Sequence, residues 1–302
     1  MDFRQYQRQT AETDQPAGGD AVTRLEIYLL GLGGEAGSVA SEYKKRLRDG
    51  EAHSQWLPRM SEELGDVLWY LAAIASELDL DLQEVAQSNI VKTRGRWLTG
   101  AVEALDARFP EAEQLPRRGE YRFVPVTSST GRPAVELWFD GVRAGDLLTD
   151  AAHEPDGYRF HDVFHLSYAS LLGWSPVTRS LLQRKRRSDA ATDENEDGGR
   201  AIVIEEGISA LVFAYAMQHH YLEDVHRLDQ RLLDSIALLT STTEARVRRA
   251  GDWERAILVG FACFRSLLAH GGGAVRFDAE AGLLEFVPTG TAPAETRGTG
   301  RG

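Results

Sequence analysis

One run of the sequence indicates the fold most clearly: Glu62-Glu63-Leu64-Gly65-Asp66-Val67-Leu68-Trp69-Tyr70-Leu71. Its apolar residues recur with the 3.6-residue period that is typical of an amphipathic helix. Glu63 and Asp66 are spaced i,i+3, so we expect both carboxylates on one face of that helix. Acids beside an apolar stripe are costly to bury unless a partner or a cation neutralises them. The spacing therefore predicts a charged partner or a metal ion at Glu63 and Asp66.

A second acidic helix is predicted upstream, in Gly34-Glu35-Ala36-Gly37-Ser38-Val39-Ala40-Ser41-Glu42-Tyr43-Lys44-Lys45. Glu35 can meet Glu63 and Asp66 if the two helices are neighbours. Three or four converging carboxylates form an all-oxygen site that suits Mg²⁺ or Mn²⁺. Such metals commonly bind phosphate oxygens, which indicates a phosphate-containing substrate. The alternative is that the acids only form a solvated helix face.

Four glycines interrupt the first of these helices, at Gly31, Gly33, Gly34 and Gly37. Each costs up to roughly 1 kcal/mol relative to alanine inside a helix. Their clustering predicts a bend or a close approach of another helix. Their spacing does not fit a dinucleotide-binding loop, and no predicted strand precedes them.

Composition limits the function classes. The chain has 302 residues, enough for two domains, and a net charge of −12 that argues against general nucleic-acid binding. Its single cysteine, Cys263, excludes an intramolecular disulfide and fits a reducing compartment. We expect no signal peptide and no membrane span, since no apolar run approaches about 18 residues. A cytoplasmic protein without a membrane partner is the prediction.

The predicted fold class is mainly α, with an N-terminal all-α helical bundle and a C-terminal helical domain that contains a small antiparallel sheet. Strands are expected at Tyr121–Val126, in a hairpin at 135–144, and in a last hairpin at 274–287. Helices are expected at 159–172, 177–187, 200–222, 227–249 and 252–270. The predicted divisions are an α-helical domain at 1–110, a linker with the first strand at 111–134, an α-rich domain at 135–287 and a disordered tail at 288–302.

A possible second site lies in the C-terminal domain. His161 and His165 are spaced i,i+4 and share a helix face, with Asp162 beside them. Glu205 and Glu206 interrupt a helix that is otherwise apolar on every side, so they need partners if that helix is buried. The candidates are the two histidines, a metal ion, or a basic run that contains Arg186.

Two interpretations remain open for the segment 184–200, which is basic and then acidic. It is either a solvated helix end followed by a mobile acidic loop, or a phosphate clamp in which the basic run 184–187, which contains Arg186, closes over a ligand. The first interpretation suits the favourable position of Arg and Lys at a helix C-terminus.

Residues 1–98 resemble the MazG-like family of all-α nucleoside triphosphate pyrophosphohydrolases. The resemblance rests on ordered motifs: the opening 1–11, the run Gly31-Leu32-Gly33-Gly34-Glu35, EELGDVLWYL at 62–71, and 80–96. It implies that Glu35 is the first acid of an ExxE motif and that Glu63 and Asp66 form ExxD. Ser38 departs from the family, which has a second glutamate there.

Further roles are implied by the same resemblance. Asn89, Lys92 and Arg96 fall where the family places residues towards the triphosphate. The spacing adds Glu42, at i+7 from Glu35 and about 10 Å along the helix, which could partly replace the missing acid as a metal ligand only if the cluster is shifted along the helix. The second half resembles a domain joined to MazG-like domains in bacterial proteins, through 156–165, 173–177 and 197–207.

These observations predict a Mg²⁺- or Mn²⁺-dependent enzyme that cleaves a nucleoside triphosphate to a monophosphate and pyrophosphate, with Glu35, Glu63 and Asp66 as catalytic residues. We expect a homodimer or a higher homo-oligomer, because about 100 residues of short helices cannot bury all their apolar surface alone. The alternative is a degenerate nucleotide-binding sensor whose C-terminal domain carries a second metal or phosphate site. Ser38 keeps this alternative open.

Overall fold

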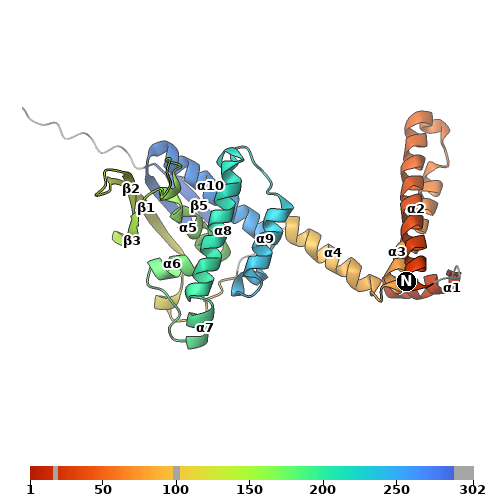
Figure 1. The fold of residues 1–302 in the computed structure, drawn as a ribbon, viewed down its shortest axis with the longest axis horizontal. Coiled ribbons are helices and arrows are strands. Elements are labelled where there is room, and N and C mark those ends of the chain that lie inside the picture. The colour runs from red at the N-terminus through yellow and green to blue at the C-terminus, as the bar shows by residue number, and fades with distance from the viewer. Residues whose placement is uncertain (16–19, 98–102, 289–302) are drawn as a thin grey trace, which may run out of the picture. The chain divides into compact units, whose positions relative to one another are not determined.

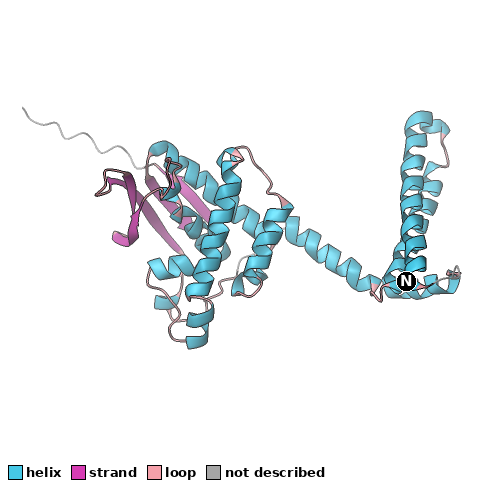
Figure 2. Ribbon diagram, in the orientation of Figure 1, coloured by secondary structure: helices cyan, strands magenta, loops and turns pink. Residues whose placement is uncertain are grey.

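The computed structural model describes residues 1–15, 20–97 and 103–288. The fold is mainly helical, as predicted, with one five-stranded sheet (Figure 2). The chain divides into two compact units, Met1–Arg94 and Gly95–Gly302. The predicted disordered tail falls, apart from Pro288, outside the described residues. Within the described residues, no helix is both long enough and apolar enough to span a membrane.

The N-terminal unit is built on a helical hairpin (Figure 1). Asp20 caps the first of its two long helices by accepting a hydrogen bond from the Thr23 amide, and Gly50 ends that helix with a φ of 57°. The elements that contribute to the unit are α1 (Phe3–Thr13), α2 (Ala21–Asp49), the short η1 (Gly50–Ala52), α3 (Trp56–Glu77) and α4 (Leu82–Trp97). The division between the two units falls inside α4.

Contacts between α2 and α3 show that the two helices run antiparallel. Arg24 pairs with Glu77 at 2.8 Å near the start of α2, whereas Glu42 meets His53 at 2.9 Å near its end. Gly31 lies against Tyr70, where an added Cβ would come within 2.2 Å of the ring. The predicted close helix approach is therefore confirmed at Gly31.

Helix α2 runs unbroken through all four glycines, so the close approach at Gly31 is the outcome that the structure shows. Gly33, Gly34 and Gly37 are exposed and have no other atoms within 4 Å of an added Cβ. Within the described part of this unit, a larger side chain would therefore fit at each of these three positions.

The C-terminal unit contains an antiparallel sheet in the order β3-β2-β1-β4-β5. Its strands are β1 (Arg118–Thr127), β2 (Pro133–Phe139), β3 (Val142–Leu148), β4 (Gly273–Asp278) and β5 (Leu283–Val287). Both predicted hairpins are confirmed. The central strand β1 pairs with β2 on one side and with β4 on the other, which joins the two hairpins into one sheet.

Helix α5 (Asp162–Leu172) forms the centre of this unit, since every one of its residues is buried. Helix α10 (Ala250–His270) packs on it, with Phe164 and Phe261 stacked at 4.4 Å between ring centroids. Gly260 permits this approach, because a Cβ there would lie 2.7 Å from the Ser167 hydroxyl oxygen. The other helices are α6 (Pro176–Leu181), α7 (Ala190–Asn195), α8 (Gly199–Met217) and α9 (Gln230–Thr240). Short 3₁₀ helices lie at Glu111–Glu113, Tyr158–Phe160, His220–Leu222 and Glu244–Val247.

The segment 184–200 fits neither interpretation offered by the sequence. The predicted helix 177–187 already ends at Leu181, and the expected loop contains α7. Arg186 and Asp197 are both buried and form an ion pair at 2.7 Å, and Arg186 also pairs with Glu244 at 2.6 Å. The chain turns inward after Leu181 because these buried charges neutralise one another.

Candidate functional site

Three carboxylates of the N-terminal unit converge on one point between α2 and α3. Glu35 comes from α2, and Glu63 and Asp66 come from successive turns of α3. One oxygen from each lies within 4.8 Å of the others. Glu35 and Glu63 are half-buried, whereas Asp66 is exposed. The structure thus brings together the three acids that helical spacing singled out, and the antiparallel hairpin explains why they meet.

The donor set of this cluster suits a hard divalent cation. All three ligand atoms are carboxylate oxygens, the donors that Mg²⁺ and Mn²⁺ prefer. The exposed Asp66 leaves one side open to solvent, where a phosphate could enter. The residues therefore fit Mg²⁺ or Mn²⁺, and their roles as ligands stay a prediction.

Ser38 is half-buried one turn after Glu35 on α2, at the position where a second acid was expected. Glu42, the other candidate ligand, does not join the cluster. Its buried carboxylate accepts hydrogen bonds from Lys45 and lies 2.9 Å from Nε2 of His53. Hydrogen bonds from Lys45 and then from His53 lower the pKa of Glu42. Glu42 is therefore held by Lys45 and His53 and lies outside the group formed by Glu35, Glu63 and Asp66.

The three predicted substrate-binding residues differ in their surroundings. Asn89 and Lys92 are exposed on α4, and no hydrogen bond or ion pair among the described residues joins their side chains to the carboxylate cluster. Arg96 instead belongs to the C-terminal unit. Its guanidinium lies 2.7 Å from Glu254 and donates to the Leu228 carbonyl at 2.8 Å. The sequence did not reveal this partner, because Glu254 is 158 residues away.

A second cluster forms in the C-terminal unit between α5 and α8, again at residues that the sequence singled out. Nδ1 of His165 lies 2.9 Å from Glu205, and both side chains are fully buried. His161, His165 and Glu206 each offer one ligand atom within 4.8 Å of the others. Asp162 lies beside them, 3.4 Å from Nε2 of His161. Neighbouring positions on α8 thus send Glu205 into the core and leave Glu206 half-exposed.

Burial and the neighbouring carboxylates together set the protonation of the two histidines in this second cluster. Burial lowers the pKa of His165, but Glu205 and then Glu206 outweigh it and raise the pKa to about 10. Burial lowers the pKa of His161, and Asp162 opposes the shift only in part. In the absence of a metal, His165 is therefore protonated at neutral pH and His161 is neutral.

Arg186 does not belong to this cluster, contrary to the expectation that it might bind a ligand there. Its side chain is 1% exposed and is bound to Asp197 and Glu244. Four of the five N–H groups of this guanidinium bind the two carboxylates, so its charge is already neutralised inside the fold.

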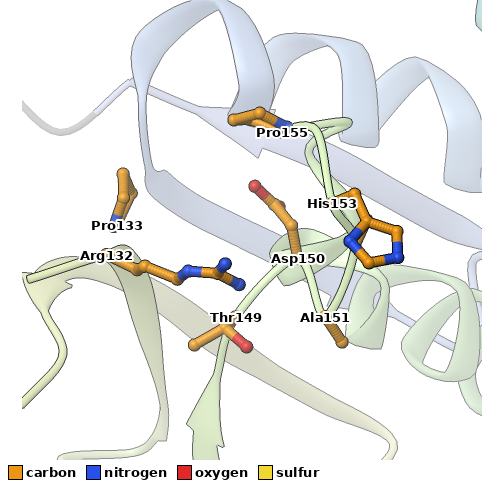
Figure 3. A pocket seen from close by; sticks show the side chains of 8 residues that line it. Arg132, Pro133, Thr149, Asp150, Ala151, His153 and Pro155 are labelled. Carbon is orange, nitrogen blue, oxygen red and sulfur yellow. The ribbon is translucent and has the colours of Figure 1, made fainter. Parts of the chain in front are cut away.

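A small cavity of about 90 Å³ lies elsewhere in the same unit, next to β2 and β3, and Figure 3 shows side chains that line it, including Arg132, Asp150 and His153. Its acid, Asp150, is already paired with Arg159 at 2.8 Å. The volume is well below the roughly 300–1,000 Å³ of typical ligand pockets. This cavity is therefore not the candidate site.

Comparison with known proteins agrees with the two-part chain. Residues 24–98 match the MazG nucleotide pyrophosphohydrolase domain, and residues 100–290 match the MazG C-terminal domain. A curated relative, the Gene 37 protein of Mycobacterium phage L5, is 38% identical over 86 residues, which covers 28% of this chain and 75% of the relative. No solved structure is significantly similar.

Proposed function

Because the chain belongs to the MazG family, with a pyrophosphohydrolase domain followed by a MazG C-terminal domain, we propose that it is a metal-dependent nucleoside triphosphate pyrophosphohydrolase. The matched domain indicates a hydrolase that acts on nucleotide anhydrides. The observation that carries the finer proposal is the convergence of Glu35, Glu63 and Asp66 within the matched range.

In the proposed reaction, a water oxygen bonds to the α-phosphorus as the anhydride bond between the α- and β-phosphates breaks, and the products are a nucleoside monophosphate and pyrophosphate. Glu35, Glu63 and Asp66 would hold Mg²⁺ or Mn²⁺. When bound, the ion neutralises phosphate charge and lowers the pKa of coordinated water. An oxygen of the same three carboxylates that is not coordinated accepts the proton of the attacking water.

The negative charge of a triphosphate is also expected to bind a basic side chain, in addition to the metal ion. Lys92 is the candidate, since its ammonium is exposed on α4 and engaged by no described acid. Asn89 lies one turn earlier on α4 and is proposed to orient the nucleotide. Arg96 is not included in this proposal, because Glu254 and the Leu228 carbonyl bind its guanidinium.

We also propose that the N-terminal unit forms a homo-oligomer. Its buried core is small, comprising Ala72, Ala75 and Leu82 with Tyr6 packed against them. Large apolar side chains of α2 and α3 are exposed instead, among them Leu30 at 77%, Leu47 at 69% and Leu57 at 62%. Covering such a surface with a second copy stabilises both copies. Analytical ultracentrifugation tests this: a monomer at micromolar concentration contradicts it.

Ser38 favours the second candidate function, a nucleotide sensor with slow turnover. A serine hydroxyl is a much weaker ligand for Mg²⁺ than a carboxylate, so the metal would be held by fewer charges than in a complete motif. Such a protein would bind a nucleotide without fast turnover, and its C-terminal unit would carry the output.

The decisive experiment is a panel of nucleoside triphosphates incubated with the full-length protein and Mg²⁺, in which pyrophosphate and monophosphate are measured together. We expect equal amounts of both products from at least one substrate, and neither after chelation of the metal. Release of orthophosphate alone, or no product from the whole panel, contradicts the enzyme. Nucleotide binding without product would support the sensor.

A further inference from the structure

The cluster between α5 and α8 contains a buried nitrogen that has no partner. Nε2 of His165 is inaccessible to solvent and forms no hydrogen bond to any described residue. The nearest acid, Glu206, lies 3.6 Å away, which is too far for a normal hydrogen bond. Buried polar atoms are nearly always satisfied, so an orphan at this position calls for an explanation.

His161 presents a second nitrogen to the same place. Its Nδ1 lies 2.8 Å from the Tyr158 carbonyl, which can only accept, so Nδ1 carries the hydrogen. The ring is also stacked on Tyr158, at 4.3 Å between centroids and 2° between planes. These two contacts fix the ring and, in the neutral tautomer, leave the lone pair on Nε2.

His165 is oriented in the same way, through a carboxylate. Its Nδ1 lies 2.9 Å from Glu205, which is itself held by the Ser175 hydroxyl at 2.6 Å and the Val177 amide at 2.8 Å. A histidine that donates one N–H to a buried carboxylate or to a backbone carbonyl, and turns its other nitrogen to a common point, is the usual arrangement around a metal ion. Both histidines show it.

Glu206 completes the group from the solvent side. The three ligand atoms lie within 4.8 Å of one another, and the 3.6 Å between His165 and Glu206 is close to the roughly 3.3 Å edge of a tetrahedron with metal–ligand bonds of about 2.0–2.1 Å. A bound metal displaces the proton on Nε2 of His165, and with both imidazoles then neutral, Asp162, Glu205 and Glu206 leave this place negatively charged. A divalent cation would balance that charge.

We propose that His161, His165 and Glu206 bind a divalent transition-metal ion, with Zn²⁺ as the best match, through two imidazole nitrogens and one carboxylate oxygen. This donor set favours zinc over Mg²⁺, which prefers oxygen ligands alone. The site is separate from the carboxylate cluster of the N-terminal unit and does not depend on the function proposed for it.

Three protein ligands leave one coordination position open, a property of sites that bind water or an external ligand and not of purely structural zinc sites. The opening lies on the side of Glu206, whose side chain is 44% exposed, whereas His165 is fully buried. The site thus gives the C-terminal unit a place for an anionic or carbonyl ligand at the metal.

The test is a Zn²⁺ titration of the metal-free full-length protein in excess Mg²⁺, which occupies the oxygen-only cluster. Co²⁺ substitution adds a visible absorption spectrum that reports nitrogen ligands and a low coordination number. Glu206→Gln and His161→Gln remove one ligand each at partly accessible positions, and circular dichroism checks their fold. His219→Gln and Glu223→Gln change exposed residues nearby in sequence and serve as matched controls.

We expect one equivalent of Zn²⁺ bound tightly by the wild-type protein and by both controls, with at least tenfold weaker binding in Glu206→Gln and His161→Gln. Glu63→Gln should retain the zinc, because it alters only the other cluster. Wild-type affinity in Glu206→Gln, or loss of zinc in Glu63→Gln or His219→Gln, would overturn the proposal. In that event His165 and the two glutamates form only a buried ion pair.

Discussion

Arg96, near the end of α4, forms an ion pair of 2.7 Å with Glu254 of α10, and both side chains are largely buried. Glu254 also accepts from the Leu228 amide at 2.8 Å and pairs with Arg227. Burial raises the pKa of Glu254, but the Leu228 amide, Arg96 and Arg227 outweigh it, so the pKa falls below its usual value. The end of α4 is thereby tied to the core of the C-terminal unit.

Arg96→Met should therefore destabilise the C-terminal unit. Removing one partner of a buried pair leaves the other uncompensated and costs up to about 3–5 kcal/mol, less here because Arg227 remains. Denaturant unfolding followed by tryptophan fluorescence measures the loss, and Arg94→Met, at an exposed position of the same helix, is the control. Unchanged stability together with a raised KM would instead return Arg96 to the substrate site.

Glu63→Gln and Asp66→Asn should each abolish metal-dependent pyrophosphate release. Both substitutions keep the size of the side chain and remove a charge from the carboxylate cluster, so the metal loses a ligand while the helix is preserved. Steady-state assays at increasing Mg²⁺ measure the effect, and Glu62→Gln is the matched control, since Glu62 is adjacent, exposed and outside the cluster. Near-wild-type rates in either site variant would place the metal elsewhere.

Ser38→Glu should tighten Mg²⁺ binding or raise the rate. The substitution adds a fourth carboxylate one turn from Glu35, on the same face of α2. The measurement is the Mg²⁺ concentration that gives half-maximal activity, compared with Ser41→Glu, one turn further along the helix. If the two variants respond alike, the gain reflects added negative charge and not a ligand at position 38.

Acid should weaken the C-terminal unit through Asp106. Burial raises the pKa of this carboxyl, but Arg117, the Leu115 amide and Arg179 together bring it below 3.8. A lowered pKa means that the stabilisation is present above 3.8 and is lost as the pH falls through the folded-state value. The free energy of unfolding of Asp106→Asn should thus be about 3–5 kcal/mol below that of the wild-type protein at pH 7. The difference should shrink as the pH drops below 4. Urea unfolding between pH 7 and pH 3 measures the stability of the wild-type protein and of the variant. If the difference in stability does not change with pH, Asp106 is not the group that responds to acid.

Gly31→Ala and Gly33→Ala separate packing from helix propensity. Both substitutions stabilise the helix by roughly the same amount, about 1 kcal/mol, because alanine has a higher helix propensity than glycine. Only the Cβ at Gly31 meets another side chain, at 2.2 Å from the Tyr70 ring, so this variant should be less stable by about 1–3 kcal/mol. Thermal unfolding compares the two. If Gly33→Ala is the less stable variant and also weakens self-association, the exposed glycines pack against a second copy.

Local patterns in the sequence were enough to predict the main helices, the strands and the candidate metal-binding acids. Helical period placed Glu63 and Asp66 on one face, and alternation with turn residues predicted the two hairpins, because both patterns are local properties of the chain. The same spacing put His161 and His165 on one face of α5. Resemblance to a family added the order of the motifs and the departure at Ser38.

The pairing of charged side chains, by contrast, becomes visible only in the folded chain. Arg186 and Asp197 lie in a stretch that reads as polar surface, yet both are buried as a pair, and Arg96 finds its partner 158 residues away. Glu42 has the spacing of a ligand but is bound by Lys45 and His53. The reason is that a charge can be buried wherever the fold supplies an opposite charge at hydrogen-bond distance, and that distance depends on packing between segments that the local sequence does not encode.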